Sequence, residues 1–99
     1  AAMQSFVTES KWLCAKGGRG VGAIVLIYNH AEKHVGSALT DIQHRYVGVV
    51  TSSMHIHLNE ENCLEIIPVR GSSSEIKDLA QELMTREGVR ELKLAIVTP

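Results

Sequence analysis

The residues best suited to chemistry in this 99-residue sequence are two histidines and a cysteine that lie close together, His55, His57 and Cys63. Imidazole nitrogen and thiolate sulfur are ligands for zinc and for the later first-row transition metals. His55 and His57 are two residues apart, so on an extended strand both rings leave the same face. The polar run at 59–62 (Asn-Glu-Glu-Asn) is typical of a hairpin turn, after which Cys63 begins the returning strand. The pattern predicts two imidazoles and one thiol on a rigid sheet, with one donor lacking.

The missing donor is expected to be His44, which lies near the end of the helix predicted before the two histidines. A whole strand separates that helix end from the tip of the hairpin. We therefore expect His44 to reach the other three donors only on a neighbouring subunit. The alternative is a solvated histidine near a helix C-terminus, where the helix dipole favours its charged form.

The ligand types leave the identity of the metal open. Three imidazoles and one thiolate can hold zinc tetrahedrally, or Ni(II) or Cu(II) in a square plane. Copper would win on affinity alone, so the choice depends on geometry and on metal availability. A disulfide between Cys14 and Cys63 is the alternative use of the thiol, but nothing else in the sequence suggests secretion. A reduced thiol in the cytoplasm is the favoured interpretation.

Length and composition predict one globular domain with a modest core. Hydrophobic residues make up 44% of the sequence and aromatic residues only 4%, so the core must be built from aliphatic side chains. The net charge is −1 and there is no basic block, which leaves no electrostatic footprint for nucleic acid. No apolar run is long enough to span a membrane, and no signal-peptide pattern is present at the start.

The elements that must position these donors begin at residue 21. Residues 21–28 form a continuous apolar run rich in β-branched residues, which predicts a central strand. Asn29 is a suitable N-cap for a helix over residues 31–46. Apolar residues recur along this segment at the spacing of one helix face, at Val35, Ala38, Leu39 and Ile42.

A second and a third strand follow this helix. The second is predicted over residues 47–58 and ends in the two histidines. The third is predicted over residues 63–70 and contains Pro68. Because proline lacks the N–H that a ladder needs, Pro68 is expected on an open side of the sheet or near the end of a strand.

A second helix and a last strand complete the chain. Ser72 and Glu75 have the spacing of a capping box at a helix start. The buried stripe of this helix is expected at Ile76, Leu79, Ala80 and Leu83. Gly88 is expected as the C′ residue that ends the helix, before a fourth strand over residues 92–97.

The predicted order β-α-β-β-α-β belongs to the α+β class and indicates a ferredoxin-like sandwich. With right-handed crossovers, this order gives an antiparallel sheet with both helices on one face. The opposite face would expose valine and isoleucine side chains, which predicts oligomerisation through it. Residues 1–20 differ from the rest and are interpreted as a linker that follows the end of an upstream helix over residues 5–16, with residues 21–99 as the second unit.

The combined motif resembles the nickel-binding regulatory domain of the bacterial and archaeal nickel-responsive transcriptional repressors. The matching segments are 43–44 (Gln-His), 54–57 (Met-His-Ile-His) and 63–66 (Cys-Leu-Glu-Ile), supported by 27–30 (Ile-Tyr-Asn-His) and 88–90 (Gly-Val-Arg). Their separations agree with the family without gaps, and the similarity runs from about residue 21 to the C-terminus. The motif is therefore specific rather than a chance pair of histidines.

The resemblance implies an ACT-like domain that assembles as a homotetramer and is not an enzyme. Ni(II) would lie in a planar site at the tetramer interface, with His55, His57 and Cys63 from one subunit and His44 from another. The family's DNA-binding part is an N-terminal ribbon-helix-helix domain, so operator DNA would be contacted only through a domain upstream of this sequence.

The same resemblance implies supporting roles for three further residues. Tyr28 would lie near the metal, Glu65 would be the acidic residue that follows the cysteine, and Gln43 would orient its neighbour across the interface. Metal-bound histidines commonly donate their second ring N–H to such partners. The plainer alternatives are that Tyr28 simply ends a core strand and that Glu65 points to water. His30 and His34 have the spacing of one helix face, which can hold a second metal ion, although an exposed pair without a metal is favoured.

Two other functions are compatible with the sequence. A zinc hydrolase would leave the fourth position open, but no general base is evidently placed and His44 would fill the vacancy. A metal-free ACT-like module would instead bind a small metabolite, such as an amino acid, between subunits.

Overall fold

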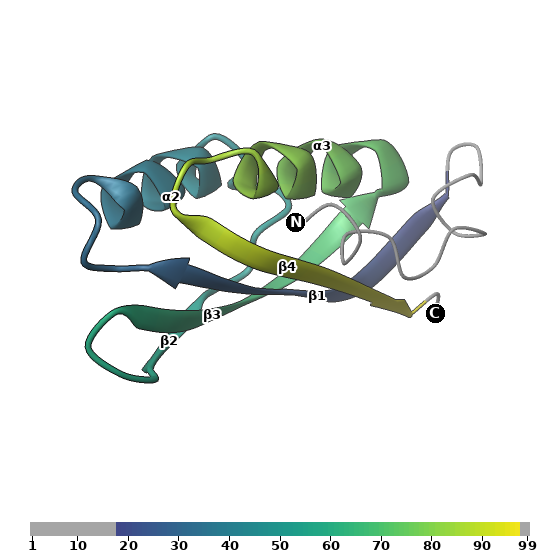
Figure 1. The fold of residues 1–99 in the computed structure, drawn as a ribbon. Coiled ribbons are helices and arrows are strands. Elements are labelled where there is room, and N and C mark those ends of the chain that lie inside the picture. Colours follow the sequence, from purple (N-terminus) through teal and green to yellow (C-terminus); the bar gives the residue numbers. More distant parts are fainter. Residues whose placement is uncertain (1–17, 98–99) are drawn as a thin grey trace.

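The computed structural model describes residues 18–97, which form a four-stranded antiparallel sheet with two helices on one face (Figure 1). In chain order the elements are β1 (Arg19–Asn29), α2 (Val35–His44), β2 (Met54–His57), β3 (Asn62–Ser72), α3 (Ser73–Met84) and β4 (Val89–Val97). The sheet order is β2-β3-β1-β4, so β1 and β3 are central and β2 lies at an edge. This arrangement confirms the predicted ferredoxin-like sandwich. The helix predicted over residues 5–16 lies outside the described residues.

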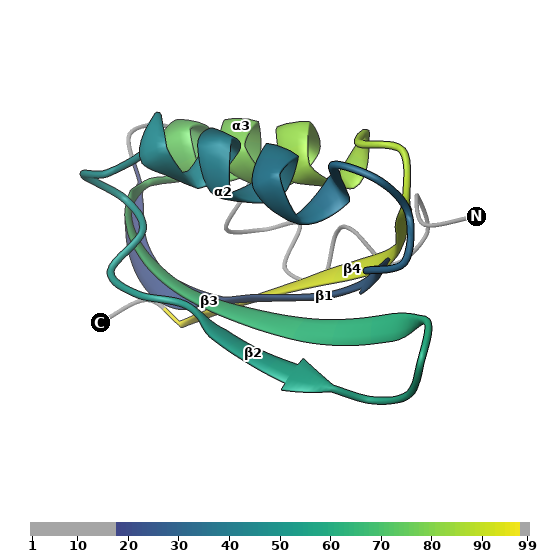
Figure 2. The same cartoon turned by 90° about the vertical axis from the view of Figure 1, so that its left-hand side faces the viewer.

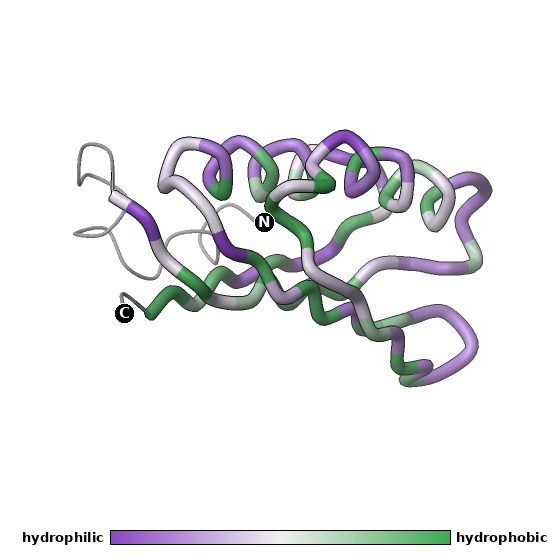
Figure 3. The backbone as a smooth tube through the Cα atoms, turned by 180° about the vertical axis from the view of Figure 1, so that it is seen from behind, coloured by the Kyte–Doolittle hydropathy of each residue, from purple (hydrophilic) through white to green (hydrophobic). Residues whose placement is uncertain are grey.

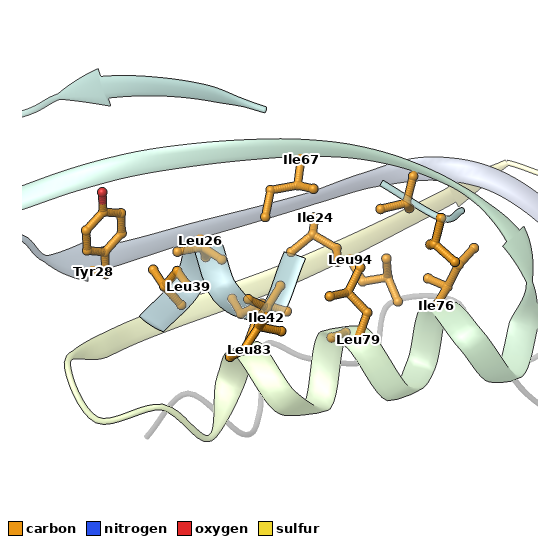
Figure 4. Packing of buried hydrophobic residues seen from close by; sticks show 14 of the residues in the cluster. Ile24, Leu26, Tyr28, Leu39, Ile42, Ile67, Ile76, Leu79, Leu83 and Leu94 are labelled. Carbon is orange, nitrogen blue, oxygen red and sulfur yellow. The ribbon is translucent and has the colours of Figure 1, made fainter. Parts of the chain in front are cut away.

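The core lies between the helices and the sheet, and aliphatic side chains form most of it (Figure 4). The predicted stripe of α3 is fully buried at Ile76, Leu79, Ala80 and Leu83. The stripe of α2 is buried at Val35, Leu39 and Ile42, whereas Ala38 is only half-buried. Strands β1 and β3 bury alternate residues, as period-2 patterning requires.

Helix α2 begins later than residue 31, the start expected from the sequence. The Asn29 side chain accepts a hydrogen bond from the N–H of Ala31 at 3.0 Å, so it caps a tight turn rather than the helix. His34 precedes the helix with a left-handed φ of 70°. His30 and His34 therefore do not share a helix face, and that part of the prediction is wrong.

Strand β2 is much shorter than the strand predicted over residues 47–58. The turn at the end of α2 continues, because the carbonyl of Tyr46 accepts from the N–H groups of Val49 and Val50 at 2.8 and 2.9 Å. The carbonyl of Pro68 then accepts from the N–H of Thr51 at 3.1 Å. In an antiparallel ladder, the N–H and the C=O of one residue point toward the same neighbouring strand. The side of Pro68 that lacks an N–H therefore faces the segment around Thr51, to which its carbonyl is bonded. Pro68 thus lies inside β3 rather than near its end, and its missing donor faces the segment that precedes the four-residue ladder of β2.

The ends of α3 agree with the prediction at one terminus only. Ser72 is the N-cap, and its hydroxyl accepts from the N–H of Glu75 at 3.3 Å. The helix ends at Met84 with Thr85 as its C-cap, so Gly88 is not the C′ residue. Gly88 instead has φ +98° in the turn before β4, and that strand begins at Val89.

No described helix covers the face of the sheet opposite α2 and α3 (Figure 2). Large hydrophobic side chains are exposed at Val21, Met54, Ile56, Leu58 and Val97. Hydrophobic stretches follow the central strands, whereas the loop between β2 and β3 is largely hydrophilic (Figure 3). Within residues 18–97, no helix has the length and apolar character needed to cross a membrane.

Candidate metal centre

The β2–β3 hairpin brings the predicted donors into register. In its antiparallel ladder His57 pairs with Cys63, and His55 pairs with Glu65. The hairpin is closed by Asn59, whose side-chain oxygen accepts from the N–H groups of Glu61 and Asn62 at 2.9 and 2.8 Å. The predicted turn and the return of the thiol beside the histidines are therefore found in the structure.

The hydrogen-bonding phase of this ladder favours close approach of the side chains. The N–H of Leu58 donates to the carbonyl of Asn62 at 3.0 Å, which makes those two residues a hydrogen-bonded pair. Bonded and non-bonded pairs alternate, so His57–Cys63 and His55–Glu65 are both non-hydrogen-bonded pairs. Such pairs have Cα atoms only about 4.5 Å apart, and their side chains leave the same face of the sheet.

Tyr28 extends this arrangement onto β1. Its register partner is Cys63, and its hydroxyl lies 3.3 Å from Nδ1 of His55. Figure 4 shows Tyr28 at one end of the core, with its hydroxyl pointing away from the labelled aliphatic residues. Burial raises the pKa of Tyr28, and a hydrogen bond with Cys63 and the charges of Cys63 and Glu65 raise it further. The phenol therefore stays protonated and is able to donate a hydrogen bond.

Glu65 is buried rather than pointing to water, with only 1% of its surface exposed. Its Oε2 atom accepts a hydrogen bond from Nε2 of Gln43 at 2.8 Å and lies 3.4 Å from Nε2 of His55. Its Oε1 atom is buried without a hydrogen-bond partner among the described residues. Gln43 thus contacts Glu65 of its own copy, so the end of α2 lies closer to the hairpin than the sequence indicated.

His55 has a partner near each ring nitrogen. Nδ1 faces the Tyr28 hydroxyl, and Nε2 faces the Glu65 carboxylate. A metal ion bound at either nitrogen would leave the other with an oxygen partner, as is usual for ligating histidines. The two supporting residues inferred from the resemblance therefore lie beside a predicted ligand.

His30 is a neighbour of the site that sequence reasoning did not identify. Its ring packs edge-on against the ring of His57, with the centroids 4.9 Å apart. Its Nε2 atom also lies 3.1 Å from the carbonyl oxygen of Asn59 at the hairpin tip. The only signal in the sequence was the position of His30, two residues after the end of the strand predicted over residues 21–28.

His44 is the last residue of α2 and is exposed. It lines an open cavity of about 450 Å³ together with Gln43, and the cavity continues over the segment that leads to β2. The other lining residues are Thr40, Val47, Val50, Thr51, Ser52 and Ser53. Within residues 18–97 of a single copy, no three histidine, cysteine or acidic side chains are grouped closely enough to hold a metal ion.

The donor chemistry nevertheless fits a late transition metal. His55 and His57 supply imidazoles on one face of an edge strand, and Cys63 is a free, buried thiol opposite His57. The Oε1 atom of Glu65, which has no proton donor within residues 18–97, provides negative charge behind these donors. This combination suits a borderline-soft cation better than magnesium or calcium, which prefer sites made of oxygen ligands.

The chain is similar in sequence to a known protein family and to several named proteins. Residues 21–97 match the family model described as "NikR C terminal nickel binding domain". A protein of Methanocella arvoryzae named "Putative nickel-responsive regulator" is 38% identical over 98 residues, which cover 99% of this chain and 70% of that protein. "Putative nickel-responsive regulator 3" of Methanosarcina acetivorans is 40% identical over 96 residues, or 97% of this chain and 69% of that protein.

Solved structures support the fold. An uncharacterized protein of Thermotoga maritima matches 81% of this chain and 99% of its own with a TM-score of 0.72 and 12% identity. The ACT domain of a GTP pyrophosphokinase of Chlorobium tepidum matches 78% of this chain and 99% of its own with a TM-score of 0.64 and 8% identity. At these identities the likeness concerns the ACT-like architecture alone.

Proposed function

The chain belongs to the family of NikR C-terminal nickel-binding domains, and we propose that it is the nickel-sensing regulatory domain of a transcriptional repressor. The family supports a nickel-sensing regulatory role, and the matched relatives are named regulators rather than enzymes. A zinc hydrolase is therefore not the function of this chain.

The proposed site holds Ni(II) between two copies of the chain. One copy supplies His55, His57 and Cys63, and a second copy supplies His44. The observation that carries this assignment is the hairpin register, which sets His57 opposite Cys63 and His55 opposite the buried Glu65. Exposure of His44 at the end of α2 leaves its ring accessible to a neighbouring copy.

Three residues support these ligands in the proposal. Tyr28 and Glu65 hold the two ring nitrogens of His55, and Gln43 holds the carboxylate of Glu65. These contacts would fix the orientation of His55 before the metal arrives. Loss of such a partner from a metal site commonly weakens affinity about 10–100-fold.

Regulation is proposed to arise because the site spans two copies. When bound, the ion supplies a cross-link between α2 of one copy and the β2–β3 hairpin of another. These two elements would then adopt one arrangement within a tetramer, and this would set the spacing of ribbon-helix-helix domains upstream. Such coupling requires only that the metal bind the two arrangements with different affinity.

Replacement of Cys63 by serine tests the proposed ligand set. The Cys63→Ser variant is expected to lose tight nickel binding and the thiolate-to-nickel absorption band, because a hydroxyl stays protonated and ligates weakly. Cys14→Ser is the matched control, and it should retain both properties. Thermal unfolding of the metal-free proteins would verify that each variant is folded. Wild-type affinity and spectrum in Cys63→Ser would refute the assignment.

Measurement of nickel binding to the wild-type chain also tests the alternative function, a metal-free module that binds a metabolite. Tight binding of one nickel ion per chain supports the sensor. If equilibrium dialysis found no tight nickel while an added amino acid shifted the unfolding temperature, the metabolite module would replace it.

A further inference from the structure

The two residues that directly follow His44 are both held by one carboxylate of the other helix. Glu82 on α3 accepts a hydrogen bond from the Arg45 guanidinium through one oxygen and from the Tyr46 hydroxyl through the other, the latter at 2.5 Å. Two donors on separate oxygens constrain direction as well as distance. We call this contact the Glu82 clamp.

The residues of the clamp are well placed to keep the end of α2 in one position. The N–H groups of Arg45 and Tyr46 donate to the carbonyls of Ile42 and Gln43, which closes the last turn of the helix. The Tyr46 ring also packs against the core. The clamp therefore joins the residues after α2 to α3 through two separate donors, the Arg45 guanidinium and the Tyr46 hydroxyl.

His44 is thus bracketed by two anchors within its own chain. On one side Gln43 is hydrogen-bonded to Glu65 of the sheet, and on the other the clamp holds the chain to α3. The backbone of His44 cannot rotate without disturbing one of these contacts. Its side chain, by contrast, is exposed and free to point out of the subunit.

We propose that Glu82 is a positioning residue, which fixes the end of α2 so that His44 is presented to the metal site of a second copy. This inference rests on the function proposed above. The side chains of Arg45 and Glu82 are 59% and 41% exposed, and exposed ion pairs of this kind contribute little to folding stability. The clamp should therefore act on metal affinity more than on the stability of the fold.

A double-mutant cycle in the full 99-residue chain tests the proposal. Glu82→Ala is expected to weaken nickel binding about three- to tenfold, measured by competition with a chelator, while the metal-free unfolding temperature changes little. Tyr46→Phe removes one of the two bonds with almost no change in volume, and should give a smaller effect in the same direction. Glu87→Ala removes an exposed carboxylate outside the clamp and should bind nickel as the wild type does.

The decisive comparison introduces Glu82→Ala into a chain that already carries His44→Ala. His44→Ala alone should weaken nickel binding by at least about a hundredfold, because a ligand is lost. If Glu82 acts through His44, Glu82→Ala should cause no further loss in this background, because the ring that it positions is gone. Equal losses in both backgrounds, or no loss in either, would overturn the role of Glu82 and leave the ligand set intact. Unchanged binding in His44→Ala alone would instead refute the shared site and this inference with it.

Discussion

The carboxylate of Glu65 lies behind the proposed nickel ligands, and within residues 18–97 only one of its oxygens is hydrogen-bonded. Gln43 donates to Oε2, whereas Oε1 is buried without a partner among the described residues. A buried charge with an unsatisfied oxygen destabilises a fold, so a functional reason for keeping it is expected. Here the purpose in our proposal is to orient His55 and to balance the charge of the bound metal.

Glu65→Gln is predicted to separate stability from metal affinity. The amide keeps an acceptor for Gln43 and nearly the same shape, but it removes the buried charge. We expect the metal-free protein to gain about 1 kcal/mol in unfolding free energy, because an unsatisfied buried charge is lost. Nickel affinity should fall about 10–100-fold, because His55 loses a charged partner. Denaturant unfolding and chelator competition measure the two effects, and losses in both would contradict this role.

At the level of single residues, the sequence predicted the candidate metal ligands but only part of their surroundings. Residue type and spacing are enough to place His55, His57 and Cys63 on one face of the hairpin, because strand periodicity fixes the face to which each points, while their role as ligands is still a prediction. The contact between His30 and His57 could not be predicted, because it depends on a tight turn that replaces the expected helix start. The bond between Gln43 and Glu65 likewise depends on how α2 docks on the sheet.

Two glycines near the start of α2 differ in the space that is available for a side chain. Gly88 has a left-handed φ of +98°, and a Cβ added there would lie 2.4 Å from Cγ2 of Val35, the first residue of the helix. Gly36 lies within α2, and a Cβ added there would have no atom within 4 Å. The turn before β4 therefore packs directly against the start of the helix that carries His44.

Gly88→Ala is predicted to destabilise the metal-free protein by about 2–4 kcal/mol, from the left-handed backbone and the collision with Val35. The control is Gly36→Ala, which should stabilise it by about 0.5–1 kcal/mol because alanine is favoured over glycine within a helix. Chemical denaturation of both variants gives these values. Similar unfolding free energies for the two would show that the turn does not support the helix.

The sequence predicted the type and order of the elements better than their ends. Apolar patterning identified the two helices and the strands other than β2, because each of these buries one face, whereas all four residues of β2 are exposed. The boundaries depended on hydrogen bonds that periodicity does not encode. Asn29 bonds to a turn rather than to α2, and the turn after Tyr46 together with Pro68 confines β2 to four residues.

The two faces of the sheet differ in what covers them. Helices α2 and α3 bury one face, while the other exposes large apolar side chains, including Ile56, which is 40% exposed on the edge strand β2. Ile56 points away from the face that carries His55 and His57, because neighbouring strand residues alternate. This open face was predicted from the sequence, and the oligomeric state that we infer from it is still a prediction.

Ile56→Glu is predicted to disrupt the proposed tetramer, because a charge on an apolar contact surface must be desolvated when the surface is buried. Size-exclusion chromatography with light scattering should show a smaller assembly at equal protein concentration. Ser74→Glu places the same charge at the exposed start of α3, and it should leave the mass unchanged. An unaltered mass for Ile56→Glu would mean that copies associate elsewhere.

The proposed function requires that two copies of the chain share one nickel site. In His44→Ala, every site lacks the imidazole that a second copy would supply. In Cys63→Ser, every site lacks the thiolate of the hairpin, so neither protein alone has a complete site. After both are unfolded and refolded together, a mixed pair should contain one intact site, with the hairpin of the first protein and His44 of the second. Random pairing should restore about a quarter of the wild-type thiolate–nickel absorption, since half of the pairs are mixed and each has one site for two chains. Absorption from the mixture that equals only the sum of the two separate proteins would contradict the shared site.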